Sequence, residues 1–459
     1  MTADLSPTRR RWLLAAVMSG LLLAMLDQSI VGTALPKIVE TLGGNDLYVW
    51  VATAYLVPAT VMLPIYARLS DRHGRRNLLL IGMALFLLGS GLAATAQNME
   101  QLIGYRALQG FGAGALEGLS FILVADLYAG RRNAALQGAL AGLMGIAFIA
   151  GPLAGGFLTD HIGWRSVFTV NLPIGAAALA VVAIVLPASV GRSERRGTPL
   201  DLTGIALLTA GVGLLLVGLN ERHVWLIAGG LVVIFGFIAV ERRAVAPVIP
   251  LKLFADRKVA AIMIAGATST FGLYAGALLL PRYFQQVRDV SATHSGLLIY
   301  PLLIGILISV NVAGMLISKR LEFRGTVLAG AGLAALGALG FATFDANTPD
   351  WQSLLFMALM GLGIGPALSG LQIALTRTLR PQQIAGGMGA LLLLRQVGGA
   401  IALAGAETVY RSSLHSHTPA VSTGTGVLAI GLVGSLIAAL ALASLPRGAG
   451  RLPAMAVPA

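Results

Sequence analysis

The stretch that decides the fold is residues 24–31, AMLDQSIV, which places the carboxylate of Asp27 inside the first long apolar run of the sequence. The run begins after three arginines at 9–11 and continues to about Ala34. At ~1.5 Å of rise per residue, Asp27 lies roughly 24 Å along a helix that needs only ~30 Å to cross hydrocarbon. An acid at that depth costs at least ~2.5–3.5 kcal/mol, so Asp27 is expected to face a cavity or a partner. The alternative is a polar residue satisfied by a neighbouring backbone.

The composition extends this membrane interpretation to the whole chain. Of 459 residues, 56% are hydrophobic and 11% are charged, and the mean hydropathy is +0.83. A soluble domain of this length would carry about a quarter charged residues. The chain is therefore predicted to be a polytopic membrane protein. Its first apolar run is too long for the core of a cleavable signal peptide. With no cysteine, the chain has no disulfide and no thiolate metal site.

Fourteen apolar runs are long enough to cross a bilayer. They lie at about 11–34, 48–70, 78–97, 101–126, 134–158, 166–187, 201–219, 224–240, 259–282, 295–317, 325–344, 352–375, 385–408 and 424–444. A polar break at residues 191–197 follows the sixth run, and an interfacial connector at 247–258 follows the eighth. An even number of spans places both termini on the same side.

The net charge of +13 is explained by orientation in the membrane rather than by nucleic acid. With a cytoplasmic N-terminus, the inner loops and tails hold 24 of the 32 Lys and Arg residues, and the outer side holds six. This bias predicts that both termini are cytoplasmic. The basic loops are expected to contact anionic membrane lipids, and no nucleic-acid partner is expected.

The runs also predict three parts: a six-helix bundle at 1–190, two inserted spans with their connectors at 191–258, and a second six-helix bundle with a short tail at 259–459. The loop at 67–76, ARLSDRHGRR, has a weaker counterpart at 314–324, GMLISKRLEFR, in the corresponding position of the second bundle. A feature repeated in this way is typical of two parallel halves with substrate and ion sites between them near the midplane.

Helix geometry connects Asp27 with the fourth span. Arg106 lies roughly 8 Å in from the outer edge of that span, a depth similar to that of Asp27, so an ion pair or a water-bridged contact is plausible. Glu117 follows eleven residues later, which is three helical turns, so it shares a stripe with Arg106. We interpret Asp27 as a proton-carrying group with Arg106 as its partner. For Glu117, a coupling role and a structural role that neutralises Arg106 through water stand side by side.

Further polar groups and close-packing residues lie in other spans. Gly151, Pro152, Gly155 and Gly156 predict a bent helix that a neighbour approaches closely, although generic membrane packing gives the same pattern. In the second half, Arg395 is expected to face the interior, whereas Glu407 lies near the outer end of its span, where acids are ordinary. The candidate contacts of a lipophilic or cationic ligand are Tyr55, Phe271, Tyr274, Arg395, Gln396 and Glu407; for the aromatic ones, core packing is the alternative.

Several kinds of chemistry are not expected. His415 and His417 lie in an outer loop without clustered carboxylates, which is a weak metal signal, and a solvated loop is the alternative. The glycine-rich segments follow no strand and lack the Lys-Ser/Thr of a phosphate loop. No arrangement of Ser, His and Asp suggests hydrolysis. We therefore expect neither an enzyme nor a cofactor, and no bound metal.

Together, these segments resemble the major facilitator superfamily and, within it, the fourteen-helix drug:proton antiporters of the EmrB/QacA type. The resemblance rests on an ordered set of motifs: LDQSIVGTALP at 26–36, ARLSDRHGRR at 67–76, Arg106 with Gln109 and Gly110, GPLAGG at 151–156, and WRSVF at 164–168 with Asn171 and Pro173. Ala67 replaces the usual leading glycine of the second motif. Glu117 matches no position typical of the family.

The resemblance implies an all-α protein of two six-helix bundles plus two inserted helices, which exports lipophilic or cationic small molecules against protons by alternating access. It implies proton roles for Asp27 and Arg106 and an exporter motif in the fifth helix. Asp71, with Arg72, Arg75 or Arg76, is expected to act as a conformational latch at the cytoplasmic face; a solvated loop charge is the alternative. The expected setting is a bacterial cytoplasmic (inner) membrane, with the monomer as the working form and the proton-motive force as the energy source. An exporter of one lipid or metabolite, or a non-transporting sensor, is the alternative function.

Overall fold

A computed structural model describes residues 6–127, 134–187 and 201–451, without residues 222, 245, 246, 248 and 250. The polar break predicted at 191–197 lies outside the described residues. The chain forms two compact units, one of residues 1–205 and 290–297 and the other of residues 206–289 and 298–459. The division into three parts predicted from the sequence stays a prediction.

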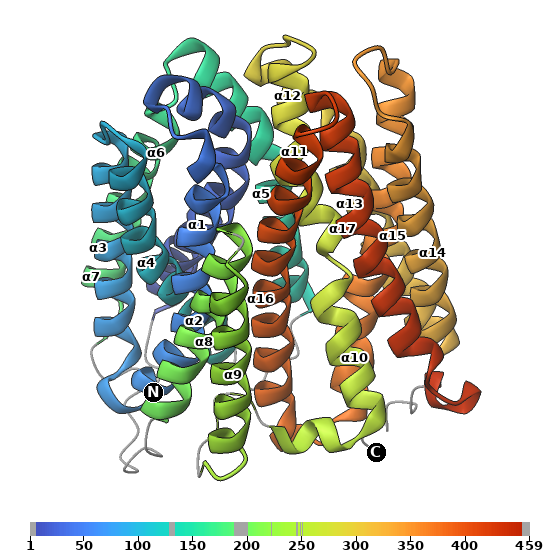
Figure 1. The fold of residues 1–459 in the computed structure, drawn as a ribbon. Helices are drawn as coiled ribbons and strands as arrows, with labels where there is room; N and C mark the ends of the chain where they lie inside the picture. Colours follow the sequence, from blue (N-terminus) through green and yellow to red (C-terminus); the bar gives the residue numbers. More distant parts are fainter. Residues whose placement is uncertain are drawn as a thin grey trace. The chain divides into compact units, whose positions relative to one another are not determined.

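The first unit is a bundle of helices (Figure 1). Its helices are α1 (Pro7–Leu42), α2 (Tyr48–His73), α3 (Arg75–Ala94), α4 (Met99–Leu127), α5 (Ala134–His161), α6 (Ser166–Thr169), α7 (Asn171–Val185) and α12 (Ala292–Leu298), with the 3-10 helix η1 at Asn45–Leu47. Helix α1 packs against α4, α5 and α7, and α4 packs against α2 and α3. Helix α1 therefore lies at the centre of this unit.

The second unit is also helical in its described part. It comprises most of α8 (Leu202–Asn220), then α9 (Val224–Glu241), α10 (Arg257–Thr268), α11 (Phe271–Gln286), α13 (Tyr300–Arg320), α14 (Arg324–Gly340), α15 (Asp350–Thr378), α16 (Pro381–Leu414) and α17 (Pro419–Ala443), with the 3-10 helices η2 (Leu251–Ala255), η3 (Phe341–Thr343) and η4 (Arg447–Gly450). Helix α17 packs against α10, α11, α14 and α16, and α15 packs against α13 and α14.

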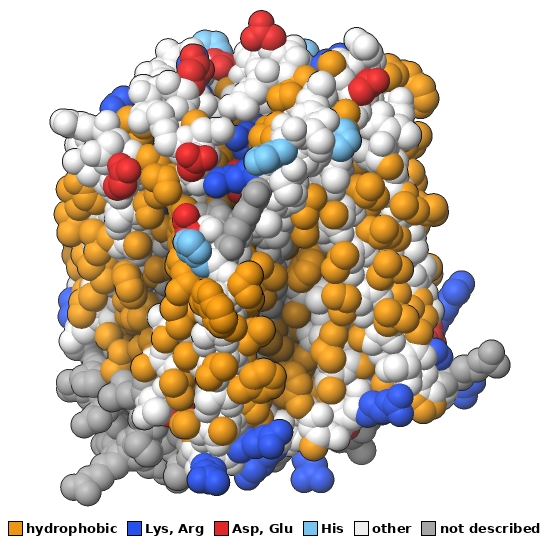
Figure 2. All heavy atoms as spheres, viewed as in Figure 1, with side chains coloured by type: hydrophobic (Ala, Val, Ile, Leu, Met, Phe, Trp, Pro, Cys, Tyr) orange, Lys and Arg blue, Asp and Glu red, His pale blue; other side chains and the backbone are white. Residues whose placement is uncertain are grey.

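The helical segments agree with a membrane protein by length and composition. Eleven helices in the described part of the chain are long and apolar enough to cross a membrane, and the apolar helix at Thr203–Leu219 is shorter. Large apolar side chains stand exposed on the helix surfaces, among them Trp225 at 87% and Ile184 at 84%. Figure 2 shows such side chains in orange along the sides of the helices, with charged side chains toward the helix ends. These surfaces are suited to lipid rather than water.

Some helix boundaries differ from the sequence-based spans. The first helix is longer than the predicted run of 11–34, because Ser6 Oγ accepts a hydrogen bond from the Arg9 amide at its start, and the helix passes Pro36 before Gly43 ends it at φ 73°. The span predicted at 259–282 is two helices, α10 and α11, which are interrupted at Ser269 and Thr270. Helix α11 continues to Gln286, so Arg282, the last residue of the run predicted at 259–282, lies inside the helix rather than at its end.

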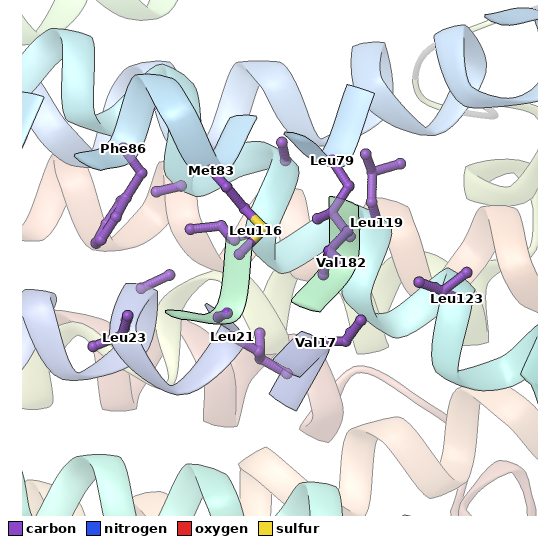
Figure 3. Close-up of a cluster of buried hydrophobic side chains, with 14 of the residues drawn as sticks. Val17, Leu21, Leu23, Leu79, Met83, Phe86, Leu116, Leu119, Leu123 and Val182 are labelled. Carbon is purple, nitrogen blue, oxygen red and sulfur yellow. The ribbon is translucent and has the colours of Figure 1, made fainter. Parts of the chain in front are cut away.

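The apolar core of the first unit joins α1, α3, α4 and α7. It contains Val17, Leu21 and Leu23 from α1, Leu79, Met83 and Phe86 from α3, Leu116, Leu119 and Leu123 from α4, and Val182 from α7 (Figure 3). Lipid tails are as apolar as these side chains, so the cluster stabilises the bundle mainly through close van der Waals contact. The polar site described next lies on the same helices.

Candidate functional site

Asp27 and Arg106 form an ion pair inside the first unit. Asp27 belongs to α1 and Arg106 to α4, and Arg106 Nη1 donates to Asp27 Oδ2. The exposed fraction of the side chain is 0% for Asp27 and 1% for Arg106. A buried charge without a partner is strongly destabilising, and each of these residues supplies the partner that the other needs. The structure thus brings together the two residues that the sequence placed at similar depth.

Three neutral polar side chains complete the surroundings of Asp27. Gln109 Nε2 in α4 donates to Asp27 Oδ1 over 2.8 Å, and Asn171 Nδ2 in α7 donates to the same oxygen over 3.1 Å. Both amides also donate to Ser90 Oγ in α3, over 3.2 and 2.9 Å. Helices α1, α3, α4 and α7 therefore share one hydrogen-bond network centred on the carboxylate, in which all five polar residues are buried.

The guanidinium group of Arg106 is held from several sides. Its Nη1 also donates to Gln109 Oε1 over 2.7 Å, and its Nε donates to the carbonyl of Val51 over 3.2 Å. The ring of Tyr55 lies 4.2 Å from the guanidinium carbon, which is a cation–π contact. Tyr55 Oη donates in turn to the carbonyl of Ala24 over 2.9 Å. Tyr55, predicted as a contact of a transported molecule, is placed by the structure against Arg106.

Two glycines allow the helices to come close enough for this network. A Cβ at Gly89 would lie 2.6 Å from the amide nitrogen of Gln109, and a Cβ at Gly110 would lie 2.4 Å from the carbonyl oxygen of Tyr55. Both distances are shorter than van der Waals contact. The backbones of α2 and α3 therefore approach α4 closely only because these positions lack a side chain.

Glu117 lies further along α4 and is buried at 4% exposure. Gln28 Nε2 donates to Glu117 Oε1 over 2.9 Å, and Gln28 is the residue next to Asp27. The carboxylate that contacts Arg106 is that of Asp27. A role for Glu117 in proton coupling stays a prediction.

The loop between α2 and α3 is a single residue, Gly74, with φ 85°, a conformation that favours glycine. Arg75 begins α3, and Arg76 Nη2 donates to the carbonyl of Ala183 in α7. The side chains of Asp71 and Arg72 lie outside the described part of the structure. The predicted latch therefore stays a prediction.

The glycines of α5 lie where neighbouring helices approach. A Cβ at Gly151 would lie 1.8 Å from Ser29 Oγ, and one at Gly155 would lie 2.4 Å from the carbonyl oxygen of Ile30, both in α1. On the other side, a Cβ at Gly156 would lie 2.4 Å from the carbonyl oxygen of Ala292 in α12. A Cβ at Gly296 in α12 would likewise lie 2.4 Å from the carbonyl oxygen of Pro152 in α5. Helices α5 and α12 therefore approach closely at both positions.

In the second unit, Arg395 in α16 is buried at 8% exposure. Its Nη2 donates to the carbonyls of Ala367 and Leu368 in α15, each over 3.1 Å. The neighbouring Gln396 accepts a hydrogen bond from Tyr274 Oη over 2.9 Å. Phe271 is also buried, at 9% exposure, at the start of α11. The structure thus brings Gln396 and Tyr274 together on α16 and α11.

A second buried ion pair lies in the same unit. Glu407 in α16 is 1% exposed and accepts from Arg282 Nη1 over 3.2 Å and from Arg411 Nε over 2.7 Å. The ring of Tyr410 lies 4.3 Å from the guanidinium carbon of Arg282. Glu407 is therefore part of the packed interior, whereas its position near the end of a predicted span had suggested the membrane interface.

The described residues contain no group of three His, Cys, Asp or Glu side chains that could hold a metal ion. His415 and His417 are exposed, and His415 Nδ1 lies 3.1 Å from the carbonyl oxygen of Arg411.

Sequence reasoning missed parts of both charged networks. Gln109 and Asn171 appeared in motifs without a role, and Ser90 was not singled out; amides and hydroxyls are common in membrane helices, so only the contact with Asp27 distinguishes them. Arg282 was missed because it is the last residue of its predicted span. Arg282 and Glu407 have opposite charges and each lies near the end of a predicted span. This similarity in depth is the signal that would have identified Arg282 as a partner of Glu407.

The fold and these buried charges define a polytopic membrane protein with ionisable groups in its apolar interior. Residues 17–403 match the model of the Major Facilitator Superfamily. The chain is 32% identical over 409 residues to Multidrug transporter protein MdtP of Bacillus subtilis (strain 168), which covers 87% of this chain and 75% of that protein. It is 30% identical over 433 residues to Efflux pump FUS6 of Gibberella moniliformis (strain M3125 / FGSC 7600), covering 91% and 77%. The chain therefore belongs to the Major Facilitator Superfamily, and it is a multi-pass membrane transporter.

Solved structures show the same fold. A bacterial homologue of the human lysosomal transporter Spinster, in an inward-facing and unoccupied conformation, superposes with a TM-score of 0.65 at 14% identity, covering 95% of this chain and 96% of that chain. The nucleoside transporter NupG gives 0.66 at 13% identity, covering 94% and 99%. At these identities the likeness concerns the fold alone.

Proposed function

We propose that this protein is a proton-coupled antiporter that exports lipophilic or cationic small molecules, as a multidrug efflux transporter of the EmrB/QacA type. The observation that carries the proposal is the ion pair of Asp27 and Arg106, which is buried and enclosed by Gln109 and Asn171. The names of two relatives, a multidrug transporter and an efflux pump, support the export of drug-like compounds.

Protonation of Asp27 supplies the coupling step. A proton on the carboxyl removes the negative charge that attracts Arg106, so the ion pair weakens and the helices that carry it, α1 and α4, are free to adopt a different packing. Substrate bound from the cytoplasm favours the state in which Asp27 releases its proton. The substrate shifts the equilibrium only by its difference in affinity for the two states. Asp71, in the last turn of α2 before Gly74, acts as a latch of one state.

The energy is sufficient for export. One proton that crosses roughly 180 mV provides about 4 kcal/mol, which supports on the order of a thousandfold gradient of a neutral solute. The proton-motive force is therefore the only energy source that the proposal needs. The protein works as a monomer in a bacterial cytoplasmic membrane, with both termini in the cytoplasm.

Fourteen transmembrane spans are part of the proposal. Eleven helices meet the criteria of length and hydropathy. Helices α4 (29 residues), α5 (28 residues) and α8 (19 residues) would complete the set of fourteen. The positions of Lys and Arg in the loops support the cytoplasmic side for both ends of the chain.

Purified protein in liposomes with a pH-sensitive dye tests the function. A lipophilic cation such as ethidium is expected to drive proton movement with wild-type protein, and Asp27→Asn is expected to abolish it while the helical content is retained. The melting temperature of this variant is expected to fall, because Arg106 stays buried without its carboxylate partner. The matched control is Glu40→Gln, which removes an exposed acid of α1 that pairs with Lys37 at the surface. If Asp27→Asn still concentrates ethidium against its gradient, the assignment of the coupling acid is wrong.

A further inference from the structure

The buried arginines of the protein differ in their partners. Arg106, Arg282 and Arg395 are the arginines that are at least nine-tenths buried in the described part of the chain. Arg106 contacts the carboxylate of Asp27, and Arg282 contacts that of Glu407. Arg395 forms no ion pair with any described Asp or Glu; its partners are two backbone carbonyls of α15. The second unit therefore contains one buried cation whose charge is not neutralised by a carboxylate among the described residues.

The depth of Arg395 makes this arrangement costly. Arg395 lies in the apolar segment Gly386–Leu414, roughly 14 Å from its start. A cation at the centre of a membrane helix costs about 2.5–3.5 kcal/mol on insertion scales. Backbone carbonyls are only partial charges, so they offset less of this cost than a carboxylate would. A structural link between α16 and α15 requires a donor to two carbonyls but not a permanent charge.

Most of the hydrogen-bonding capacity of Arg395 is unused. A guanidinium group has five N–H donors. Nη2 makes both bonds to α15, whereas Nε is buried and has no partner among the described residues. Nη1 donates to no described group. Three of the five donors are therefore available to an acceptor that is not part of the described chain.

Gln396, the residue next to Arg395, contributes N–H donors without adding a charge. Gln396 Oε1 accepts from Tyr274 Oη over 2.9 Å, which fixes the orientation of its amide and leaves Nε2 as the free end of the group. Gly399, one turn further, allows the ring of Tyr274 to lie against α16, because a Cβ there would come within 2.4 Å of the ring. Arg395 and Gln396 thus present N–H groups from adjacent positions of α16.

We propose that Arg395, assisted by the amide of Gln396, binds the anionic group of a lipophilic carboxylate in the second unit. This inference rests on the proposed export function and names a further substrate class, amphiphilic acids, beside neutral and cationic compounds. The carboxylate accepts hydrogen bonds from the unused guanidinium donors and neutralises the buried charge, while its apolar part remains in the hydrophobic interior. Charge-assisted hydrogen bonds of this kind are roughly twice as strong as neutral ones.

Three dansyl probes that differ only in the head group test this inference. They are 11-(dansylamino)undecanoic acid, its carboxamide and the corresponding terminal amine, and binding is measured by dansyl fluorescence with protein in nanodiscs, after subtraction of empty nanodiscs. The acid is expected to bind wild-type protein at least tenfold more tightly than the carboxamide. Arg395→Gln is expected to remove this preference, with a loss of roughly ten- to a hundredfold for the acid and little change for the amine.

A second variant keeps the test decisive if Arg395→Gln does not fold. Gln396→Glu supplies an internal carboxylate beside Arg395, so it is expected to weaken binding of the acid at least tenfold and to leave binding of the amine unchanged or stronger. The charge control is Arg288→Gln, which removes an arginine that lies just after α11 and pairs with the exposed Asp350 at the start of α15. It is expected to change none of the three affinities.

The outcomes separate this inference from the proposed function. Equal binding of the acid and the carboxamide to wild-type protein, or an equal loss for all three probes in Arg395→Gln, overturns the anion site. Proton movement driven by ethidium in liposomes is unaffected by either result and continues to test the export function alone.

Discussion

Gln109 lies between the two charges of the buried pair and contacts Asp27 directly. Its Nε2 donates to Asp27 Oδ1 over 2.8 Å, while its Oε1 accepts from Arg106 Nη1 over 2.7 Å. The amide thereby offers a donor to the anion and an acceptor to the cation. Because Arg106 and Gln109 are three positions apart on one helix, α4 alone orients both groups toward Asp27.

Replacing Gln109 by Leu should weaken the site without removing either charge. The variant loses one hydrogen bond to Asp27 and one from Arg106, and hydrogen bonds to charged groups contribute about 1.5–3 kcal/mol each. We expect a lower melting temperature and roughly a tenfold loss of ethidium-driven proton movement, measured in the liposome assay. Gln109→Glu keeps the shape but adds a negative charge, and it should not rescue the loss. An unchanged rate in Gln109→Leu would show that the amide is not needed.

Asn171→Asp should lower transport more than Asn171→Leu. Asn171 donates to Asp27 Oδ1, so an aspartate at this position places two carboxyl groups against each other and adds like-charge repulsion to the loss of the hydrogen bond. Asn171→Leu removes the hydrogen bond alone, so we expect roughly a tenfold loss of ethidium-driven proton movement for the Leu variant and a larger loss for the Asp variant in the liposome assay. Rates equal to that of wild-type protein in both variants would contradict the contact.

Gly151→Ala should destabilise the first unit because of the close approach of α5 to α1. A Cβ at Gly151 would lie 1.8 Å from Ser29 Oγ, so either the serine or the helix must move. Overpacking of this kind costs typically about 1–3 kcal/mol. The matched control is Gly104→Ala in α4, where a Cβ meets nothing within 4 Å. The melting temperature of the purified protein is expected to fall by several degrees in the first variant and to stay level or rise in the second.

Glu407→Gln should be more damaging than loss of the whole ion pair. The change removes the carboxylate that accepts hydrogen bonds from Arg282 and Arg411, and leaves Arg282 in the interior. Breaking a buried pair by removal of one partner costs about 3–5 kcal/mol. The double variant Glu407→Gln/Arg282→Met removes the buried cation as well, and should recover part of the thermal stability. A double variant that is as unstable as the sum of its two single variants would exclude coupling between the residues.

Asp160 predicts a pH dependence at the end of α5, beyond the apolar run. Partial burial raises the pKa of the Asp160 carboxyl, but the hydrogen bonds from Thr293 and Ala292 outweigh burial and place the pKa below its ordinary value. A lowered pKa in the folded state means that the contribution to stability is complete above the unfolded value of about 3.9 and is lost as the pH falls through the folded value.

The contact between Asp160 and α12 should therefore be insensitive to pH between about 5 and 8 and should open in stronger acid. Hydrogen exchange of the Ala292 and Thr293 amides, corrected for the intrinsic exchange rate, measures this directly. Asp160→Asn should exchange faster at neutral pH and show a smaller change in acid. Protection that declines between about pH 8 and 6 would contradict the assignment to this carboxyl.

The sequence was sufficient for the membrane class and for the main residues of the first unit. Depth along a helix is a nearly linear function of residue number, so the similar depths of Asp27 and Arg106 follow from their positions in the chain alone. The packing of α5 could also be anticipated, because Gly151 and Gly155 mark one face of a helix. The functional roles of these residues stay predictions, while their contacts with each other and with α1 are structural observations.

The other contacts of the two charged networks could not be predicted, because they depend on how each helix is rotated about its axis and on the exact residue at which each helix ends. Whether Asn171 and Ser90 face Asp27 is decided by how α3 and α7 rotate about their axes, and an almost uniformly apolar helix gives no amphipathic pattern that fixes this rotation. Arg282 was placed at the end of its predicted span because that span stopped one turn too early. The partner of Glu407 was missed for the same reason.

Helix α1 has a further consequence for motion. It runs without interruption for 36 residues, which is about 54 Å and longer than the apolar thickness of a bilayer. The close approach of Gly151 and Gly155 fixes it near Ser29 and Ile30, next to the buried acid. The start of the helix at Pro7 is about 30 Å from Asp27. A tilt of about 10° around that point would move the N-terminal end of the helix by about 5 Å, so a small rearrangement near Asp27 would produce a larger displacement at Pro7.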